Sequence, residues 1–454
     1  MSQPAPTTSL TRRIFNLSWP IIGLNVLQVL SLLVDTMMVG RVPDAETALT
    51  GMGYATNIVF LLMVAMIGLT VGTVAFIARA HGAGDSKRVD HILQQSTQFT
   101  VGLGIVIAVV GNLLGPTLLR ALGADDASAT SALAYLRPVL VGTVFNYLNI
   151  LFAATLRGVG NTRMAFMVAV VMNALNVLFN TALILGSWGF PALGLQGAAI
   201  GTVASQAIAA GLMFVLLARG VVPGIRARLA LAWPDRTLAT ELARVGAPAA
   251  LDMVILNAAL LAMVGMLGRI DQAAVAAHGI GLRVQGLAFV PGMSISQATG
   301  SIVGNALGRG DVDEAKKALR ISVVLSSAIM AVLALPIVLE ASAIVGLFDV
   351  SPSSPVHAYS VQWMRLLGFG IPIAGMYVAF VGLFQGSGST GTSLRINAGT
   401  TLLIQIPASF ILGFPLGLGT WGVWAAFPLT FVAKLIWAVI EYRRERWAVT
   451  GTTV

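Results

Sequence analysis

The chain has 454 residues, of which 57% are hydrophobic and only 10% are charged, and its mean hydropathy is +0.87. An ordinary soluble domain has about 25% charged residues, so this chain cannot present a charged surface to water on all sides. The net charge of +9 would suit a nucleic-acid partner, but the apolar composition leaves no room for the basic water-exposed face that such binding requires. The absence of cysteine excludes disulfides, cysteine zinc sites and thiol nucleophiles.

Charge clusters and Gly or Pro breaks divide the sequence into twelve apolar stretches, each long enough to cross a bilayer as a helix. They are continuously apolar, as between Ile58 and Ile77, whereas membrane β-strands alternate over segments of about ten residues. The sequence therefore predicts an all-α polytopic membrane protein with twelve transmembrane helices. We place these helices at residues 14–40, 51–79, 91–119, 129–156, 163–186, 193–219, 238–268, 273–306, 314–347, 357–385, 393–415 and 419–442.

Lysine and arginine are distributed unevenly between the connections on the two sides of the membrane. Of the 27 basic residues, 20 fall on one side, 4 on the other and 3 within spans. Cytoplasmic loops carry the excess of basic residues, so we expect both termini in the cytoplasm and a multi-pass protein of the inner (plasma) membrane. The same bias accounts for the net charge, so we expect no nucleic-acid partner. The 4 basic residues in the outer connections are Arg41, Arg120, Arg137 and Arg269, and the 3 within spans are Arg283, Arg365 and Lys434.

The two halves of the chain repeat each other at a nearly constant offset. Four sets of residues recur in the same order with shifts of 225 to 228 positions, which is hard to obtain by chance in apolar sequence. The pairs are Pro20 with Pro248, Gly82-Ala83-Gly84-Asp85 with Gly308-Arg309-Gly310-Asp311, Arg157 to Thr162 with Gln385 to Thr390, and Gly194 and Gly197 with Gly419 and Gly422.

Each repeat contains six spans, an even number, so both copies enter the membrane from the same side. Such a parallel repeat is one of the architectures of secondary transporters, in which one bundle rocks against the other. We expect an N-terminal six-helix lobe at residues 1–219, a basic cytoplasmic linker at 220–237 and a C-terminal six-helix lobe at 238–454. We expect the protein to be a monomer.

Polar residues of the first lobe share one depth in the predicted bundle. Asp35 lies five residues before Gly40, about 7 Å from the outer end of the first span at 1.5 Å per residue. An ionisable residue there is costly and is a functional candidate by default. The fifth span carries three asparagines whose spacings of three and four residues put the middle one on a face with each of the others. The residues grouped with Asp35 at this depth are Asn176 and Asn180, with Thr202 from the sixth span and Tyr135 from the fourth, and Asn173 is a candidate support on the face of Asn176.

This set of side chains has the chemistry of a cation site. A carboxylate out of water is costly to ionise and can accept a proton from an acidic exterior, while carboxylate, amide and hydroxyl oxygens are also hard ligands for sodium. Asp35, Asn176, Asn180 and Thr202 are therefore a candidate site for H⁺ or Na⁺, and we expect no other cofactor. The alternative for the three asparagines is that they only bond helices together.

The second lobe carries weaker candidates. The repeat maps Asp35 onto Met263, so the carboxylate is not duplicated at that position. Asp252 follows Pro248 by four residues and is either an acid that lines a cavity for a cationic substrate or a residue with an interfacial cap or ion-pair role. Arg283 needs a carboxylate or carbonyl partner at its depth. Met37 and Met38 are candidates for a pliable substrate wall, although packing or lipid contact would also explain them. His278 has the pattern of a helix-contact residue.

Motifs in the first half together resemble the multidrug and toxic compound extrusion (MATE) family, and the similarity covers essentially the whole chain. They are Val34-Asp35-Thr36-Met37-Met38-Val39-Gly40, Gly82-Ala83-Gly84-Asp85, Leu156 to Thr162, and Leu195-Gln196-Gly197-Ala198-Ala199.

The resemblance implies twelve helices in two lobes and export of organic, often cationic, compounds driven by inward movement of protons or sodium. The pattern is closest to DinF-like members, which implies the coupling role for Asp35 with support from Asn176, Asn180 and Thr202. Those relatives carry an acid where Asn180 stands, so the paired-carboxylate version of the site is missing here.

The function that follows is secondary antiport of amphipathic, cationic organic compounds against H⁺ or Na⁺. An ATP-driven pump is excluded in this chain because it has no Gly-x-x-x-x-Gly-Lys-Ser/Thr loop, and an enzyme is not expected because no catalytic constellation is visible. The alternative is a flippase for a lipid-linked or polyprenyl substrate. A flippase would be expected to line its cleft with several basic residues, but only three lie within spans here.

Overall fold

The computed structural model describes residues 9–228 and 233–452, and its regular secondary structure in these ranges is entirely helical. Within them, twelve helices are long and apolar enough to cross a membrane. This confirms the all-α fold with twelve candidate spans that the apolar stretches predict. Large hydrophobic side chains such as Leu113 and Leu261, each 73% exposed, cover much of the helical surface, as expected for helices that face lipid.

The helices follow the chain in two comparable series. The first comprises α1 (Leu10–Val39), α2 (Ala45–Gly82), α3 (Ser86–Ala121), α4 (Asp126–Gly158), α5 (Thr162–Ile184), the 3₁₀ turn η1 (Ser187–Gly189) and α6 (Gly194–Ala218). The second comprises α7 (Arg236–Gly268), α8 (Gln272–Gly308), α9 (Val312–Leu339), α10 (Ala341–Gly346), α11 (Pro355–Gly386), α12 (Thr390–Thr400), the π-helical turn η2 (Thr401–Gln405), α13 (Ile406–Gly413) and α14 (Gly419–Arg443).

Two expected spans differ from the helices in detail. The stretch 314–347 is not one helix, because α9 ends at Leu339 and the short α10 begins at Ala341. Pro336 lies in the last turn of α9, and its carbonyl accepts the Glu340 N–H that closes the helix. The stretch 393–415 is one span, Thr390–Gly413, but the π turn η2 interrupts its α-helical hydrogen bonding.

The chain forms two compact units, and each unit takes the beginning of a helix from the other half of the sequence. The N-terminal unit is Pro20–Ala247, and the C-terminal unit is Met1–Trp19 together with Pro248–Val454. The division therefore falls inside α1 and α7, immediately before Pro20 and Pro248. A proline within a helix removes one backbone hydrogen bond. These units differ from the lobes 1–219 and 238–454 at the ends of those two helices.

Packing explains why the starts of α1 and α7 belong to the unit formed mainly by the other half of the sequence. Ile14 of α1 is fully buried in a cluster with residues of α8, α9, α11 and α14, and Arg13 forms an ion pair of 2.7 Å with Glu314. The start of α7 packs on α2, where a Cβ added at Gly72 would lie 2.9 Å from the Leu242 carbonyl oxygen. Apolar burial and an ion pair thus hold the start of α1 in the C-terminal unit, and close backbone approach holds the start of α7 in the N-terminal unit.

The internal repeat is visible in local structure as well as in sequence. In the N-terminal unit Thr73 of α2 hydrogen-bonds Ser96 of α3 at 3.0 Å, and in the C-terminal unit Thr299 of α8 hydrogen-bonds Ser322 of α9 at 2.7 Å. Both pairs are related by a shift of 226 positions. The aspartates of the repeated Gly-x-Gly-Asp motif, Asp85 and Asp311, each cap the following helix by accepting a backbone N–H three residues on. The two halves therefore share a three-dimensional plan.

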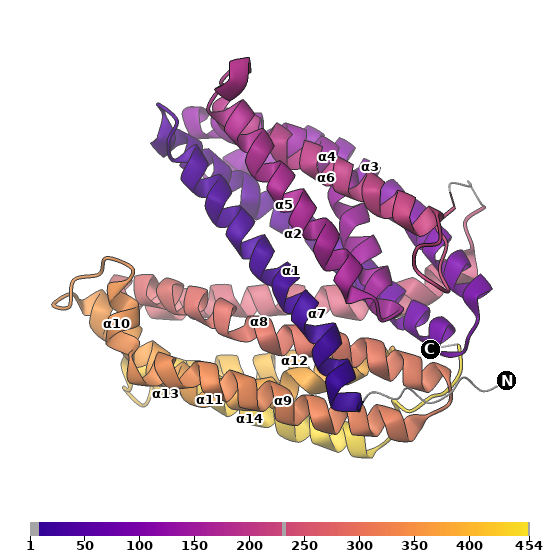
Figure 1. The fold of residues 1–454 in the computed structure, drawn as a ribbon. Helices are drawn as coiled ribbons and strands as arrows, with labels where there is room; N and C mark the ends of the chain where they lie inside the picture. Colours follow the sequence, from indigo (N-terminus) through magenta and orange to yellow (C-terminus); the bar gives the residue numbers. More distant parts are fainter. Residues whose placement is uncertain (1–8, 229–232, 453–454) are drawn as a thin grey trace. The chain divides into compact units, whose positions relative to one another are not determined.

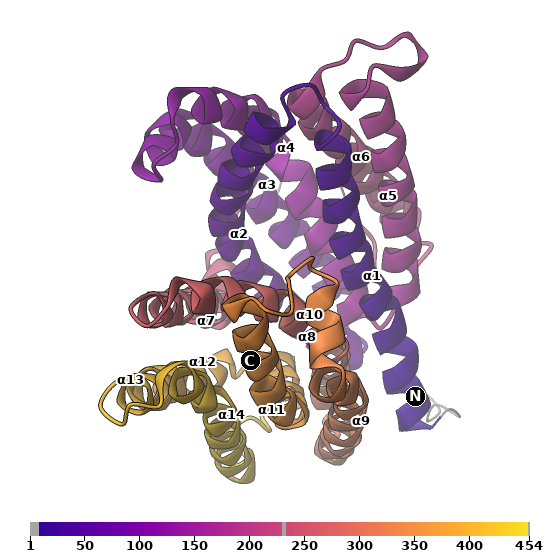
Figure 2. The same ribbon diagram turned by 90° about the vertical axis from the view of Figure 1, so that its left-hand side faces the viewer.

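A central helix organises each unit (Figures 1 and 2). In the N-terminal unit α4 packs on α2, α3 and α6, and in the C-terminal unit α11 packs on α8, α9 and α14. Glycine allows the closest of these contacts: a Cβ at Gly386 of α11 would lie 2.1 Å from the Gly300 carbonyl oxygen of α8. Small residues at helix crossings are the usual way in which membrane helices approach each other.

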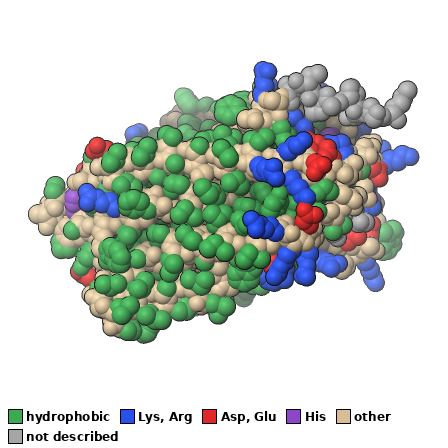
Figure 3. All heavy atoms as spheres, turned by 90° about the horizontal axis from the view of Figure 1, so that it is seen from below, with side chains coloured by type: hydrophobic (Ala, Val, Ile, Leu, Met, Phe, Trp, Pro, Cys, Tyr) green, Lys and Arg blue, Asp and Glu red, His purple; other side chains and the backbone are tan. Residues whose placement is uncertain are grey.

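Basic side chains gather at one end of the face drawn in Figure 3, and hydrophobic side chains cover most of the rest. This separation is the pattern that the excess of Lys and Arg in one set of connections predicts. The orientation of the termini across the membrane stays a prediction.

The described part of the linker, residues 221–228 and 233–235, is tied to the start of α3. The Arg226 N–H donates to Asp90 at 2.7 Å, the Gln95 side-chain amide donates to the Trp233 carbonyl at 3.1 Å, and His91 Nε2 lies 3.0 Å from Asp235 Oδ2. The hydrogen bond to His91 is the main reason that the pKa of Asp235 lies below its ordinary value of 3.8.

The lowered pKa of Asp235 predicts that this attachment depends on pH. Because the folded pKa is depressed, the contribution is complete above the ordinary value and is lost as the pH falls through the folded value. Hydrogen exchange of residues 233–245, corrected for intrinsic rates, should show protection at pH 7 that declines below about pH 4. The Asp235→Ala variant should lack the protection at pH 7, and pH-independent protection in the native protein would contradict the prediction.

Candidate functional site

The polar residues of the N-terminal unit form one hydrogen-bonded chain across α1, α5 and α6. Asn180 Nδ2 donates to Asp35 Oδ1 at 2.6 Å and lies 3.3 Å from Asn176 Oδ1, and Asn176 Nδ2 donates to Thr202 Oγ1 at 3.1 Å. Ser31 of α1 lies at the margin of the chain, with its hydroxyl 3.5 Å from Asn176 Oδ1. The structure therefore brings together the four residues to which the sequence analysis assigns ion coupling.

Asp35 is held out of water by this packing. Its side chain is 7% exposed, and those of Asn176 and Asn180 are 3% and 0% exposed. No basic residue forms an ion pair with Asp35 in the described ranges, and its Oδ2 accepts no hydrogen bond there. An ionised carboxylate without a cation is costly at such a place, so binding of a proton or a metal cation would stabilise it.

A second oxygen in the cluster is also unsatisfied. Asn180 Oδ1 is buried without a hydrogen-bond partner, and a Cβ added at Gly201 of α6 would lie 2.4 Å from it. Gly201 thus lets the backbone of α6 pass directly over the Asn180 amide. The absence of a side chain at this position is as much a part of the site as the polar groups are.

The remaining candidates of this unit lie at different distances from the cluster. Tyr135 of α4 is 9% exposed and lies near Asp35, although no hydrogen bond joins them. Asn173 donates to the Ala169 carbonyl of its own helix at 2.8 Å and does not join the chain. Met37 is 64% exposed on the outside of α1, and Met38 is half-buried. Neither methionine is brought to the cluster by an interaction in the structure.

A second acid–amide pair lies in the C-terminal unit. Asn397 Nδ2 of α12 donates to Asp252 Oδ2 of α7 at 2.7 Å, and the Tyr377 hydroxyl of α11 donates to Asn397 Oδ1 at 2.7 Å. Asp252 is therefore part of a network inside the unit, which does not fit an interfacial cap. Both Asp252 and Asn397 remain partly accessible, whereas Tyr377 is 5% exposed.

Lys434 of α14 completes this second cluster. It is 7% exposed, its Nζ lies 5.8 Å from the centre of the Tyr377 ring, and its charge interacts with that of Asp252. A carboxylate and an ammonium group thus lie in one partly buried polar cluster. The first cluster has no such internal cation, so the two acids differ in how their charge is balanced.

The other ionisable candidates of the C-terminal unit stand apart. Arg283 is exposed on α8 and has neither a hydrogen bond nor an ion pair in the described ranges, so no partner of the kind expected from the sequence is found there. His278 is fully buried against Trp363 and Phe427, with ring centres 5.3 and 6.2 Å away, and neither ring nitrogen is hydrogen-bonded within the described chain. Aromatic packing fits the helix-contact reading of His278.

Sequence reasoning missed Tyr377, Asn397 and Lys434 as partners of Asp252. A signal existed for Lys434, which is one of only three basic residues within the expected spans. Asn397 had no such signal, because the repeat aligns it with Ala169 and Asp252 with Leu24 at the offset of 228. Each unit thus has one acid–amide pair, but the two pairs lie at different levels of their units. The repeat equivalent of Asp252 is Leu24, which precedes Asp35 by eleven residues, or about 16 Å along the helix.

The chemistry of the first cluster suits a small hard cation. Its donors are one carboxylate, amide oxygens and a hydroxyl, which match the ligands that alkali and alkaline-earth ions use, and the unpaired Asn180 Oδ1 is an oxygen that needs a donor or a cation. No group of three His, Asp or Glu side chains able to hold a metal occurs in the part of the chain described, so the set does not resemble a transition-metal site.

Comparisons with known proteins agree with this architecture. The family model described as MatE matches residues 20–182 and again residues 248–411, which start at the two prolines that divide the units. The chain is 25% identical to a probable multidrug resistance protein NorM of Thermotoga maritima (96% of this chain, 93% of the relative) and 26% identical to an FAD transporter of Shewanella oneidensis (92% and 91%). Its fold is similar to a crystal structure of MATE in the bent conformation, with a TM-score of 0.87, 23% identity and coverage of 98% of both chains.

Proposed function

The chain belongs to the MATE family, which its two matches to the MatE model establish, and we propose from this premise that it exports amphipathic, cationic organic compounds in exchange for H⁺ or Na⁺. Family membership also confirms that the protein is an ion-coupled membrane transporter and not an enzyme. The proposal names a substrate class because multidrug resistance proteins are among its relatives. We further propose, from the pattern of its motifs, that it is closest to the DinF-like members.

One observation carries the proposal: a buried carboxylate in the N-terminal unit that has no internal cation. Asp35 is hydrogen-bonded to Asn180 through one oxygen only, and no ion pair within the described chain neutralises it. A proton or a sodium ion at Asp35 Oδ2 would remove the cost of the buried charge. Asp35 can therefore alternate between a cation-free state and a state that holds a proton or a sodium ion. A carboxylate that is permanently paired with an arginine could not, because the arginine already balances its charge.

Exchange of ion for substrate follows if the coupling ion and the transported compound favour different conformations of the N-terminal unit. A cation at Asp35 changes what Asn180, Asn176 and Thr202 donate and accept, and these side chains link α1, α5 and α6. A ligand shifts a conformational equilibrium only by its differential affinity for the two states. Competition between the coupling ion and a cationic substrate for one negative charge supplies such a difference, and the resulting coupling is reciprocal.

Efflux in proteoliposomes under separately imposed gradients tests the proposal and identifies the ion. A fluorescent amphipathic cation should be transported when either a proton or a sodium gradient is imposed, and the effective gradient defines the coupling ion. Transport of the same compound in the absence of either gradient, at the same rate, would refute antiport. Lipid scrambling measured in the same vesicles separates the flippase alternative.

Replacing Asn180 with aspartate should change the ion preference. Asn180→Asp puts a second carboxylate next to Asp35, where the amide now donates at 2.6 Å, and like charges so close cannot both stay ionised without a cation. We expect the variant to retain a proton or to bind sodium more strongly than the native chain. The check is efflux rate against pH and sodium concentration, and unchanged dependence on both would argue against a role for α5 in coupling.

Asp252 is proposed to contact the positive charge of the substrate. Asp252→Asn keeps the hydrogen bond from Asn397 sterically feasible but removes the negative charge beside Lys434. We expect the apparent KM for cationic compounds to rise about tenfold, as for the loss of one charge-assisted contact, with little change for an uncharged compound of similar shape. Equal changes for both compounds would indicate a structural role instead.

Placement in the cell follows from the basic residues. We propose a monomer in the inner membrane with both termini in the cytoplasm, divided into lobes at residues 1–219 and 238–454. The bias of Lys and Arg to one set of connections supports this orientation.

A further inference from the structure

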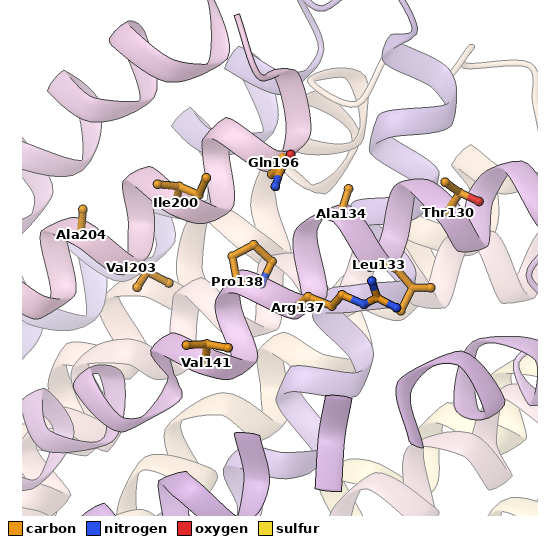
Figure 4. A pocket seen from close by; sticks show the side chains of 10 residues that line it. All are labelled: Thr130, Leu133, Ala134, Arg137, Pro138, Val141, Gln196, Ile200, Val203 and Ala204. Carbon is orange, nitrogen blue, oxygen red and sulfur yellow. The ribbon is translucent and has the colours of Figure 1, made fainter. Parts of the chain in front are cut away.

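A groove lies between α4 and α6 of the N-terminal unit, with a cavity volume of about 700 Å³ (Figure 4). Both helices begin at the same end of the unit, so the groove runs alongside two parallel helices from their N-terminal ends toward their middles. At its floor the helices approach closely, since a Cβ at Gly142 of α4 would lie 2.3 Å from the side chain of Val203. The volume is within the range of small-molecule sites.

The lining changes from polar to apolar along the groove. Thr130 and Arg137 of α4 and Gln196 of α6 are polar and lie in the N-terminal parts of their helices. Leu133 and Ala134 lie between Thr130 and Arg137 on α4, so the polar end of the groove also has apolar side chains. Toward the helix middles the lining is entirely apolar: Pro138, Val141, Ile200, Val203 and Ala204. An amphiphile with a polar head and a hydrocarbon chain matches this gradient.

Arg137 is the only charged residue among those that line the groove, and it has no hydrogen bond or ion pair with any residue that the structure describes. It is exposed, and its side chain extends along α4 toward Leu133, which is the direction of the helix N-terminus (Figure 4). Long basic side chains of membrane helices extend in this way toward the lipid headgroups. A guanidinium that reaches the headgroup region can pair with an anion, and phosphate oxygens match its paired donors.

We propose that this groove binds one anionic phospholipid, with its phosphate on Arg137 and an acyl chain along Val141, Val203 and Ala204. The lipid comes from the leaflet at the Asp126 end of α4. Thr130 and Gln196 supply further polar contacts at the headgroup, and the apolar lining takes the chain.

The groove shares α6 with the coupling cluster, and its other helix, α4, carries Tyr135. Tyr135 precedes Arg137 by two residues on α4, and Thr202 directly precedes Val203 on α6. In each helix these neighbours point to different faces, since residues one or two apart do not share a face. A lipid held across α4 and α6 would therefore fix the spacing of the helices that carry Tyr135 and Thr202.

Native mass spectrometry of the full chain, released from micelles after incubation with dioleoylphosphatidylglycerol or dioleoylphosphatidylcholine, tests the proposal. The native protein should retain one phosphatidylglycerol with about tenfold preference over phosphatidylcholine, as expected for a charge-assisted contact. Arg137→Gln should reduce the preference to near one. Arg120→Gln is the matched control, because Arg120 is exposed at the corresponding end of α3 and does not line the groove.

A second variant separates lipid binding from general surface charge. Ala204→Phe fills the apolar part of the groove and should reduce retention of both lipids while leaving the thermal stability of the protein near that of the native chain. Retained phosphatidylglycerol preference in Arg137→Gln, or equal losses in Arg120→Gln, would overturn the proposal. So would an adduct with the mass of a second protein chain, or displacement of the lipid by the transported cation, because each assigns the groove another occupant.

Discussion

Asp35→Asn should abolish ion-driven efflux and leave the protein folded in the membrane. The amide is nearly isosteric with the carboxylate and can still accept the Asn180 N–H that now lies 2.6 Å from Oδ1, so the packing of α1 on α5 should survive. It cannot take up a proton or carry a negative charge for sodium. We therefore expect efflux under either gradient to fall to the level of protein-free liposomes.

The matched control is Asp44→Asn. Asp44 is an exposed aspartate in the connection between α1 and α2, and its side chain does not cap α2. This variant should transport at the native rate. Thermal unfolding of both variants in detergent separates loss of coupling from loss of fold, and near-native efflux by a folded Asp35→Asn protein would refute the assignment of Asp35.

Gly201→Ala should disrupt the same site without altering any polar group. The added Cβ would lie 2.4 Å from Asn180 Oδ1, closer than real contacts of this kind, and 3.3 Å from the Asn180 backbone nitrogen, which is a tight contact. Either α6 moves away from α5 or the Asn180 side chain rotates out of its bond to Asp35. Overpacking of this kind costs about 1–3 kcal/mol, and we expect efflux to fall more steeply than stability, because coupling depends on the displaced amide.

Gly211→Ala on the same helix is the control for this experiment. Nothing lies within 4 Å of a Cβ at Gly211, and the position is exposed. Alanine is favoured over glycine in a helix by about 1 kcal/mol, so this variant should be as stable as the native chain or slightly more stable. Native efflux in Gly201→Ala would show that close packing of α6 on Asn180 is unnecessary for transport.

The two units have diverged at equivalent positions while keeping a common framework. Where the N-terminal unit has Asp35 and its amide partner, the C-terminal unit places the Met263 sulfur 3.4 Å from the Ser409 hydroxyl, a contact without an ionisable group. The acid of the C-terminal unit is Asp252, about three helical turns nearer the start of α7, and Lys434 balances it. This asymmetry supports a division of labour in which one acid handles the coupling ion and the other the substrate.

The sequence by itself determined the twelve spans, the repeat and the identity of the first cluster. Long apolar runs can be accommodated only as membrane helices, because every backbone polar group must be satisfied within the bilayer. An acid such as Asp35 stands out in such a run because of its cost. The depth of Asp35, Asn180 and Thr202 followed from counting residues along helices of known rise, and the structure brings these three together in a hydrogen-bonded chain.

Only the tertiary structure decided which side chains meet across helices. Helix rotation about its own axis determines whether a polar residue faces a neighbour or lipid, and apolar residues on all sides of a membrane helix leave no periodic signal to fix that rotation. For this reason Asn173 was grouped with its neighbours although it bonds its own helix, and the Asp252–Asn397–Tyr377 network was not foreseen. The start of α1 packs in the other unit for the same reason, since contacts between distant segments depend on packing that local sequence does not encode.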